Sequence, residues 1–300
     1  HPGNAAYNLP FALKLRGELD IRSLEKAFES LVSRHEILRT VYLEKEEGSV
    51  QLVQAIKPWA LEVEDLRYLR EQALSEVINN LIKQEARKPF DLGVGPVIRA
   101  RLAKLPDDGP DSEASFSQEQ NSASYLLLIT MHHIAGDGWS LNILCDEVER
   151  AYAIASKEKE ANRDLSREGL SIPQEVPVQY GDYALWQNRL FESGLLESQE
   201  GYWREKLRGV PVMDLPSDRL GPPEQDFRGE NHYFSLSGEK VRALKELGRT
   251  RGVTLYVILL SCFKVLLHRY TQDEDICVGT PVANRTLPEL EKLSTSKNYQ

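Results

Sequence analysis

Apolar residues in the middle of the chain follow two patterns in succession. Residues 125–131 form a near-continuous apolar and β-prone run, which is typical of a strand covered on both faces. Gly136 and Gly138 then permit a tight turn, and apolar residues recur at three- and four-residue spacing over residues 141–152. The pattern predicts a buried strand, a short turn and an amphipathic helix.

Similar patterns predict the remaining elements. Phe11, Leu13 and Leu15 alternate as in a strand, and Asp20 is placed to cap the helix that follows. Further strands are expected at residues 39–44, 50–53, 61–63, 96–102 and 276–279, and further helices at residues 67–86, 240–248 and 254–270. Strands and helices mixed in this way indicate an α/β protein.

Two polar stretches interrupt these elements. Residues 107–123 are rich in Gly, Pro, Ser and Asp, and they are predicted to form a long solvated loop. Residues 156–176 separate the central helix from the next apolar pattern, and we expect the boundary between two lobes there. The predicted lobes are residues 1–176 and residues 177–300.

Ionisable residues gather at the end of the central strand. His132 and His133 are followed by Asp137 and Gly138, at a strand-to-helix junction where α/β proteins build sites. An imidazole titrates near neutrality and accepts a proton from an amine or a hydroxyl at cellular pH. Adjacent strand residues face opposite ways, so one histidine acts and the other supports it. The Gly138 backbone N–H is placed to donate to a developing oxyanion.

The Asp137 carboxylate has two candidate roles. It orients a histidine, or it pairs with a cation from elsewhere in the chain, because a carboxylate near the interior needs an opposite charge. Arg285 follows an apolar run that carries its guanidinium towards a buried strand end, so we expect it to be the partner. Arg39 is the second candidate, although the end of a helix accounts equally well for a cation there.

A pair of histidines also occurs in proteins for reasons other than catalysis. A histidine beside an apolar strand is most often a satisfied core side chain. Zinc sites use histidines one turn apart on a helix, or spaced Cys and His, and the sequence around His132 offers neither arrangement. The chain has no GxGxxG, GxxxxGK or GxSxG motif, so nucleotide binding and serine hydrolase chemistry have no support.

The order HHxxxDG after a buried strand resembles the active-site motif of nonribosomal peptide synthetase condensation domains, in the chloramphenicol-acetyltransferase-like superfamily. Other segments are similar to family patterns and occur in the family's order. These segments are YNLPFALKLRGELD from Tyr7, RHEILRTVY from Arg34, PFDLGVGPVIRARL from Pro89, YGDYALW from Tyr180 and VGTPVANR from Val278. Together they span nearly the whole chain.

The resemblance implies an α/β fold of the α+β type, a two-layer sandwich with two chloramphenicol-acetyltransferase-like lobes. It also implies an acyltransferase that forms amide bonds. Its substrates would be a donor acyl or peptidyl thioester and an acceptor aminoacyl thioester. Both would be held on the phosphopantetheine of carrier domains, with an adenylation domain in the same assembly line and no cofactor on this chain. His133 would be the catalytic residue, as a base or as a group that positions the amine. The supporting residues would be His132, Asp137, Gly138, Arg285 and Arg39.

The sequence departs from the family pattern at both ends. The motif SxAQxRLWxL does not precede the Tyr7 segment, and residues 293–300 stand where the family continues towards GxFVNT. We therefore expect a fragment with a nearly complete first lobe and a partial second lobe. Two other functions remain open: a stand-alone acyltransferase that uses acyl-CoA, and an inactive fragment that only docks carrier proteins.

Composition narrows the choice of partners. The net charge of −9 and the lack of a basic stripe argue against nucleic acid. No apolar run approaches the roughly 18 residues of a membrane span, so we expect no membrane contact. Cys145, Cys262 and Cys277 lie in apolar patterns and cannot all pair, and they are predicted to be reduced core residues of a cytoplasmic protein.

Overall fold

The structure is a computed structural model that describes residues 4–46, 48–106, 123–161, 176, 178–218, 234–280 and 282. The described strands are β1 (Asn8–Arg16), β2 (Thr40–Lys45), β3 (Gly48–Val53), β4 (Glu62–Asp65), β5 (Ile98–Leu105) and β6 (Ser124–His132). The described helices are α1 (Ile21–Arg34), α2 (Glu71–Arg87), α3 (Gly138–Ala161), α4 (Tyr180–Glu192), α5 (Glu197–Lys206), α6 (Gly238–Arg251) and α7 (Leu255–Thr271), with a 3-10 helix, η1, at Glu36–Arg39.

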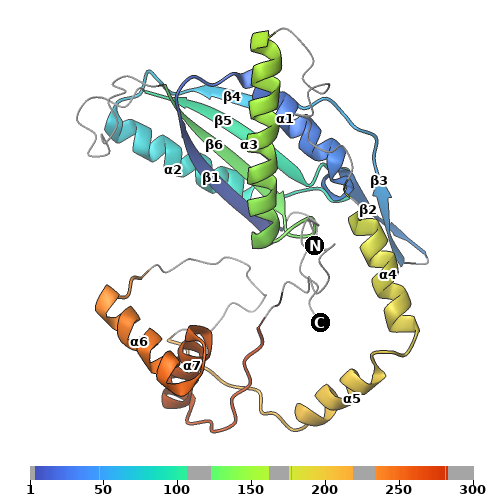
Figure 1. Ribbon diagram of the computed structural model, residues 1–300, viewed down its shortest axis with the longest axis vertical. Helices are drawn as coiled ribbons and strands as arrows, with labels where there is room; N and C mark the ends of the chain where they lie inside the picture. The colour runs from blue at the N-terminus through green and yellow to red at the C-terminus, as the bar shows by residue number, and fades with distance from the viewer. Residues whose placement is uncertain are drawn as a thin grey trace. The chain divides into compact units, whose positions relative to one another are not determined.

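A four-stranded sheet carries the site. Its strand order is β1-β6-β5-β4, so β6 lies between β1 and β5 (Figure 1). Both neighbours run antiparallel to β6, whereas β4 runs parallel to β5. A separate two-stranded sheet joins β2 to β3. The strand predicted from the central apolar run is therefore an interior strand whose backbone is paired on both sides.

Helices cover both faces of the four-stranded sheet. Alternate β6 side chains, Leu127, Ile129 and Met131, join the apolar core beneath α1 and α3, and these two helices cross the front of the sheet in Figure 1. Leu126 and Leu128 point to the opposite face and pack with the apolar side chains of α2. This alternation follows from the pleat of a strand, and it confirms the prediction that the central strand is buried on both faces.

The chain divides into two compact units. The described residues up to Arg189 belong to the first unit, and Leu190–Thr280 form the second, which contains α5, α6 and α7. The predicted lobe boundary at residue 176 stays a prediction, since residues 162–175 lie outside the described part of the chain. Residues 156–161, assigned to the polar stretch from sequence, continue α3 as helix.

Most of the predicted elements are present. The expected strands at residues 39–44, 50–53, 61–63 and 96–102 correspond to β2, β3, β4 and β5, and the expected helices correspond to α2, α6 and α7. The strand expected at residues 276–279 is wrong, because these residues form no strand pairing within the described chain. A short apolar run becomes a strand only where a neighbour completes its hydrogen-bond ladder. The loop predicted at residues 107–123 lies outside the described residues except for Ala123.

The three cysteines are free thiols. Cys145 is half-buried, and burial, with Asp146 as a smaller cause, raises the pKa of its thiol. Cys262 and Cys277 are exposed, so their predicted place in the core is wrong. An apolar pattern does not show which side of a helix is covered.

Within the described chain no single helix is long and apolar enough to cross a membrane. Helices α6 and α7 together pass the same test of length and composition, but they meet at a 105° bend.

Candidate active site

Backbone hydrogen bonds from both sides hold the end of β6. The His132 N–H donates to the Val97 carbonyl at 2.9 Å, and the His133 N–H donates to the Tyr7 carbonyl at 2.7 Å. In the ladder with β1, His132 lies opposite Asn8. The positions of both histidines are therefore set by the residues that lead into β1 and β5, the two strands that flank β6.

The His132 ring contacts a backbone N–H and two aromatic rings. Its Nδ1 accepts a hydrogen bond from the Ile134 N–H at 3.1 Å, which leaves the proton of the neutral ring on Nε2. The rings of Tyr7 and Phe90 each lie 6.1 Å from the His132 ring, centroid to centroid. Burial, with the neighbouring His133 as a smaller cause, lowers the pKa of His132. This environment favours a neutral, structural imidazole.

The His133 side chain is less constrained. It is half-buried, and within the described part of the chain its ring makes no hydrogen bond or ion pair. A ring nitrogen that is not committed to another side chain and is partly accessible can bind the amine of a substrate. Of the two histidines, His133 therefore has the ring that is available for chemistry.

Asp137 caps the helix that follows the turn. Its Oδ1 accepts hydrogen bonds from the Ser140 N–H and the Ser140 hydroxyl, both at 2.8 Å, and its own N–H lies 3.2 Å from Ser140 Oγ. Both side chains are buried. The first turn of a helix leaves backbone N–H groups without an acceptor within the helix, and these reciprocal bonds satisfy such groups. Sequence reasoning missed this role, although an Asp followed three residues later by a Ser ahead of an apolar helical pattern was the signal for it.

The two glycines of the turn have different roles. A Cβ atom on Gly136 would lie 2.4 Å from Met131 Cε and 3.1 Å from Ser140 Cβ, so a larger residue at this position would force the buried Met131 side chain to move. A Cβ atom on Gly138 would meet nothing within 4 Å. Gly138 is exposed and is the first residue of α3, so its backbone N–H lies at the end of the helix that attracts negative charge.

The structure describes one of the two predicted cation partners of Asp137. Arg285 lies outside the described residues, so its ion pair with Asp137 stays a prediction. Arg39 donates to the Gln54 carbonyl at 2.6 Å and lies 3.4 Å from the Glu36 carboxylate. These contacts tie η1 to the segment after β3, which supports a structural role for Arg39.

A partly buried polar cluster joins the end of α1 to α3. His35 Nε2 lies 2.7 Å from Glu147 Oε2, and Arg34 Nε lies 3.3 Å from Glu147 Oε1. The His35 side chain is only 2% exposed. Because Glu147 belongs to the helix that begins at Gly138, the RHEILRT segment helps to align that helix. Glu147 was not found from sequence, since a single acidic residue in an amphipathic helix looks like any solvated position.

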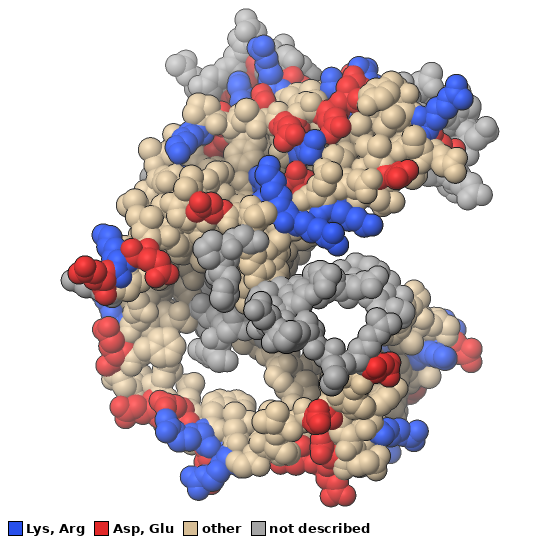
Figure 2. Space-filling view, turned by 180° about the vertical axis from the view of Figure 1, so that it is seen from behind, with Lys and Arg blue, Asp and Glu red and all other residues tan. Residues whose placement is uncertain are grey.

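We also looked for other candidate sites among the described residues. Among the described residues, no group of three or more His, Cys, Asp and Glu is arranged to hold a metal ion. A groove of about 600 Å³ is lined by Glu62, Asn80, Lys83, Gln84, Glu85, Arg87, Lys88 and Arg101, and it contains neither histidine of the site. On the face seen in Figure 2, acidic and basic side chains are interspersed.

Comparisons with known proteins agree with the sequence motifs. The family described as Condensation domain matches residues 1–295. One component of the linear gramicidin synthase of Brevibacillus parabrevis is 36% identical over 295 residues, which are 97% of this chain and 4% of that protein. Chondramide synthase cmdD of Chondromyces crocatus is 36% identical over 290 residues, which are 97% of this chain and 7% of that protein. The chain thus spans a small part of the length of these relatives.

A solved structure supports the fold. The X-domain from teicoplanin biosynthesis is 25% identical and superposes with a TM-score of 0.79 over 97% of this chain and 59% of that chain. The predicted fold class, with its chloramphenicol-acetyltransferase-like arrangement, is confirmed by this similarity. By the family match and these relatives, the chain belongs to the condensation-domain family of nonribosomal peptide synthetases.

Proposed function

We propose that this chain joins a donor acyl or peptidyl thioester to an acceptor aminoacyl thioester, with His133 acting on the attacking amine. Family membership supplies the reaction class, since condensation domains form amide bonds. The choice of His133 rests on the contrast between the two rings. His132 is bound by Ile134 and flanked by two aromatic rings, whereas the His133 ring has no hydrogen bond within the described chain.

The proposed reaction moves the acyl group from sulfur to nitrogen. The acceptor nitrogen attacks the donor carbonyl carbon, the C–N bond forms and the C–S bond breaks. The proton that the amine loses leaves with the thiolate as a thiol. His133 either accepts that proton in transit or holds the amine by a hydrogen bond, and an imidazole is suited to both roles at neutral pH. A thioester is already reactive, so orientation of the two substrates supplies a large part of the barrier reduction.

The remaining site residues stabilise the turn and the negative charge of the tetrahedral intermediate. In this mechanism the Gly138 N–H, at the start of α3, donates to the oxyanion of the tetrahedral intermediate. Asp137 holds the turn through Ser140. Arg285 is proposed to complete the charge balance of the buried Asp137 carboxylate.

The proposed partners follow from the same reaction. The phosphopantetheine arms that carry both thioesters belong to carrier domains upstream and downstream, and an adenylation domain loads the acceptor in the same assembly line. This chain then needs no cofactor of its own. The free thiols of all three cysteines fit a reducing compartment, and we place the reaction in the cytoplasm.

The test is a comparison of donors with the full-length protein. A donor thioester on a carrier protein and an acceptor aminoacyl thioester on a second carrier protein are supplied, and the amide product is followed by mass spectrometry. A parallel reaction offers the same acyl group on coenzyme A, and an acceptor with an acetylated amine is the control. We expect product from the carrier-bound donor only.

Two outcomes contradict the proposal. Turnover of the coenzyme A thioester in preference to the carrier-bound donor indicates a stand-alone acyltransferase. Binding of both carriers without any product indicates a docking module.

A further inference from the structure

A cluster of polar side chains lies on the same face of the sheet as His132, the face that α2 covers. Asn8 of β1 lies opposite His132 in the ladder, and Arg99 of β5 lies opposite Thr130, two residues before His132. Residues opposite one another in an antiparallel ladder share a face, and so do residues two apart in a strand. Asn8, Arg99 and His132 therefore stand on the same face, from three adjacent strands.

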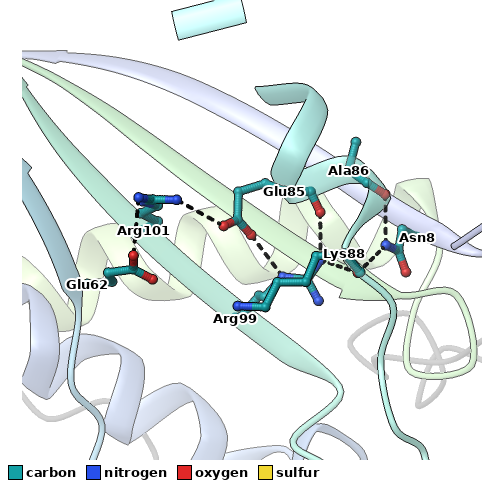
Figure 3. Close-up of polar contacts among 7 residues, drawn as sticks. All are labelled: Asn8, Glu62, Glu85, Ala86, Lys88, Arg99 and Arg101. Atoms are coloured by element: carbon teal, nitrogen blue, oxygen red, sulfur yellow. Dashed lines mark hydrogen bonds and ion pairs between the residues drawn. The ribbon is translucent and has the colours of Figure 1, made fainter. Parts of the chain in front are cut away.

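Two of these side chains hold the end of α2. Asn8 Nδ2 donates to the Ala86 and Lys88 carbonyls at 2.8 and 2.9 Å. Arg99 Nη2 donates to the Glu85 and Lys88 carbonyls, both at 2.6 Å, and Arg99 Nε donates to the Glu85 carboxylate at 2.9 Å. Figure 3 shows both side chains reaching the same helix end. The last carbonyls of a helix lack partners within the helix, so this double contact fixes where the chain leaves α2.

Phe90 follows two residues after Lys88 and lies between Arg99 and His132. The Arg99 guanidinium carbon stands 4.1 Å from the centre of the Phe90 ring, a distance typical of a cation–π contact. The Phe90 and His132 rings lie 6.1 Å apart at an angle of 88°, a preferred edge-to-face geometry. A continuous path of contacts thus runs from the end of α2 through Arg99 and Phe90 to the imidazole.

We infer that Arg99 and Phe90 are positioning residues of the proposed reaction: they hold the His132 ring, and through it the turn that carries His133. The link to His133 is short. His132 Nδ1 binds the Ile134 N–H and the His132 carbonyl accepts from the Ala135 N–H at 2.9 Å, so the His132 ring and backbone brace the two residues after His133. This inference rests on the proposed function, because it assigns His133 the reacting group.

The same strand offers a matched control. Arg101 is two residues after Arg99 on β5 and on the same face, and it also contacts Glu85, at 3.6 Å. Its other partners are Glu62 and Glu64 at 3.1 and 2.8 Å, and Figure 3 shows it on the far side of Glu85 from Asn8. Arg101→Lys therefore disturbs the charged cluster without removing the contact to Phe90.

The first experiment reads the His132 ring directly. NMR of histidine-labelled protein gives separate signals for the two ring nitrogens, and the His132 signals are assigned by their loss in His132→Gln. In the wild type the neutral ring is expected to carry its proton on Nε2. Arg99→Lys and Phe90→Leu are expected to give a mixture of the two tautomers, whereas Arg101→Lys leaves the ring signals as in the wild type.

The second experiment measures amide formation by the full-length protein. Arg99→Lys and Phe90→Leu are expected to lower kcat by about 10-fold to 100-fold, with little change in KM, because a small displacement of a reacting group affects the transition state more than binding. Unchanged ring signals and kcat in both variants overturn the inference. Equal changes in Arg101→Lys also overturn it, since they indicate a general loosening of the sheet. The ring signals need no substrate, so a wild-type protein that forms no amide refutes the proposed function separately.

Discussion

The Asp137 carboxylate and Ser140 bind one another through three hydrogen bonds at the start of α3. The pair closes the turn between the two histidines and the helix, and both side chains are buried. The Asp of the HHxxxDG motif is therefore a helix cap in this structure, which explains a large part of its role without contact to substrate.

Loss of the Ser140 hydroxyl is expected to destabilise the fold. Ser140→Ala removes one hydrogen bond to a buried carboxylate and the acceptor for the Asp137 N–H, which costs about 1 to 2 kcal/mol of unfolding free energy. Urea unfolding followed by circular dichroism measures the change. Ser156→Ala is the control, because the buried Ser156 Oγ in the same helix has no hydrogen-bond partner among the described residues. An equal loss of stability in both variants contradicts the special role of Ser140.

The predicted ion pair between Asp137 and Arg285 is tested by a double-mutant cycle. Asp137→Asn keeps a capping side chain but removes the charge, and Arg285→Gln removes the proposed partner. We expect the two changes to be coupled by at least about 1 kcal/mol of unfolding free energy, as for residues in direct contact. The parallel cycle with Arg39→Gln is expected to show additive effects, because the Arg39 guanidinium is held by Gln54 and Glu36. Coupling to Arg39 in place of Arg285 refutes the assignment.

Gly138 offers a way to remove one backbone N–H without harming the helix. Proline is favoured at the first position of a helix, and the Gly138 position has open space around it. If the N–H stabilises the oxyanion, Gly138→Pro lowers kcat by about 10²-fold to 10³-fold, while Gly138→Ala keeps the N–H and most of the activity. Thermal unfolding checks that both variants fold. Equal activity of the two variants removes Gly138 from the mechanism.

Sequence patterns predicted the frame of this site because its parts are local. A buried strand, two glycines and an amphipathic helix follow one another without a gap, so the junction at His132 and His133 could be placed from periodicity alone. The close approach of Gly136 to the Met131 side chain, in contrast, depends on how Met131 packs, which periodicity does not show.

The contacts that align the site could not be predicted in the same way. Asn8 binds the end of α2 from about eighty positions away, and Glu147 binds His35 across two helices. Such partners depend on strand order and register, which one sequence does not specify. The prediction of a strand at residues 276–279 was wrong for the same reason, since a strand forms only where a neighbouring strand pairs with it.

The pKa of His132 predicts a pH dependence of stability. Burial and the neighbouring His133 hold this pKa below the ordinary histidine value, which is about 6.5. Between the two values the unfolded chain binds a proton that the folded chain does not bind, so the free energy of unfolding falls as the pH is lowered through this window.

The comparison of wild type with His132→Gln isolates this contribution. The wild type is expected to lose stability relative to the variant as the pH falls from about 7 to about 5, because only the wild type carries the depressed group. Urea unfolding at several pH values gives the difference. A difference that stays constant or moves in favour of the wild type on acidification contradicts a depressed pKa at His132.

The most direct test of the central claim is amide formation by the full-length protein carrying His133→Ala, with both carrier-bound substrates supplied. We predict that kcat/KM falls by about 10²-fold or more, as for loss of a general base or a positioning group, while unfolding free energy stays near that of the wild type. His132→Ala is instead predicted to act mainly by lowering the free energy of unfolding. A His133→Ala protein with native stability and unchanged turnover would contradict the assignment of His133 as the acting residue.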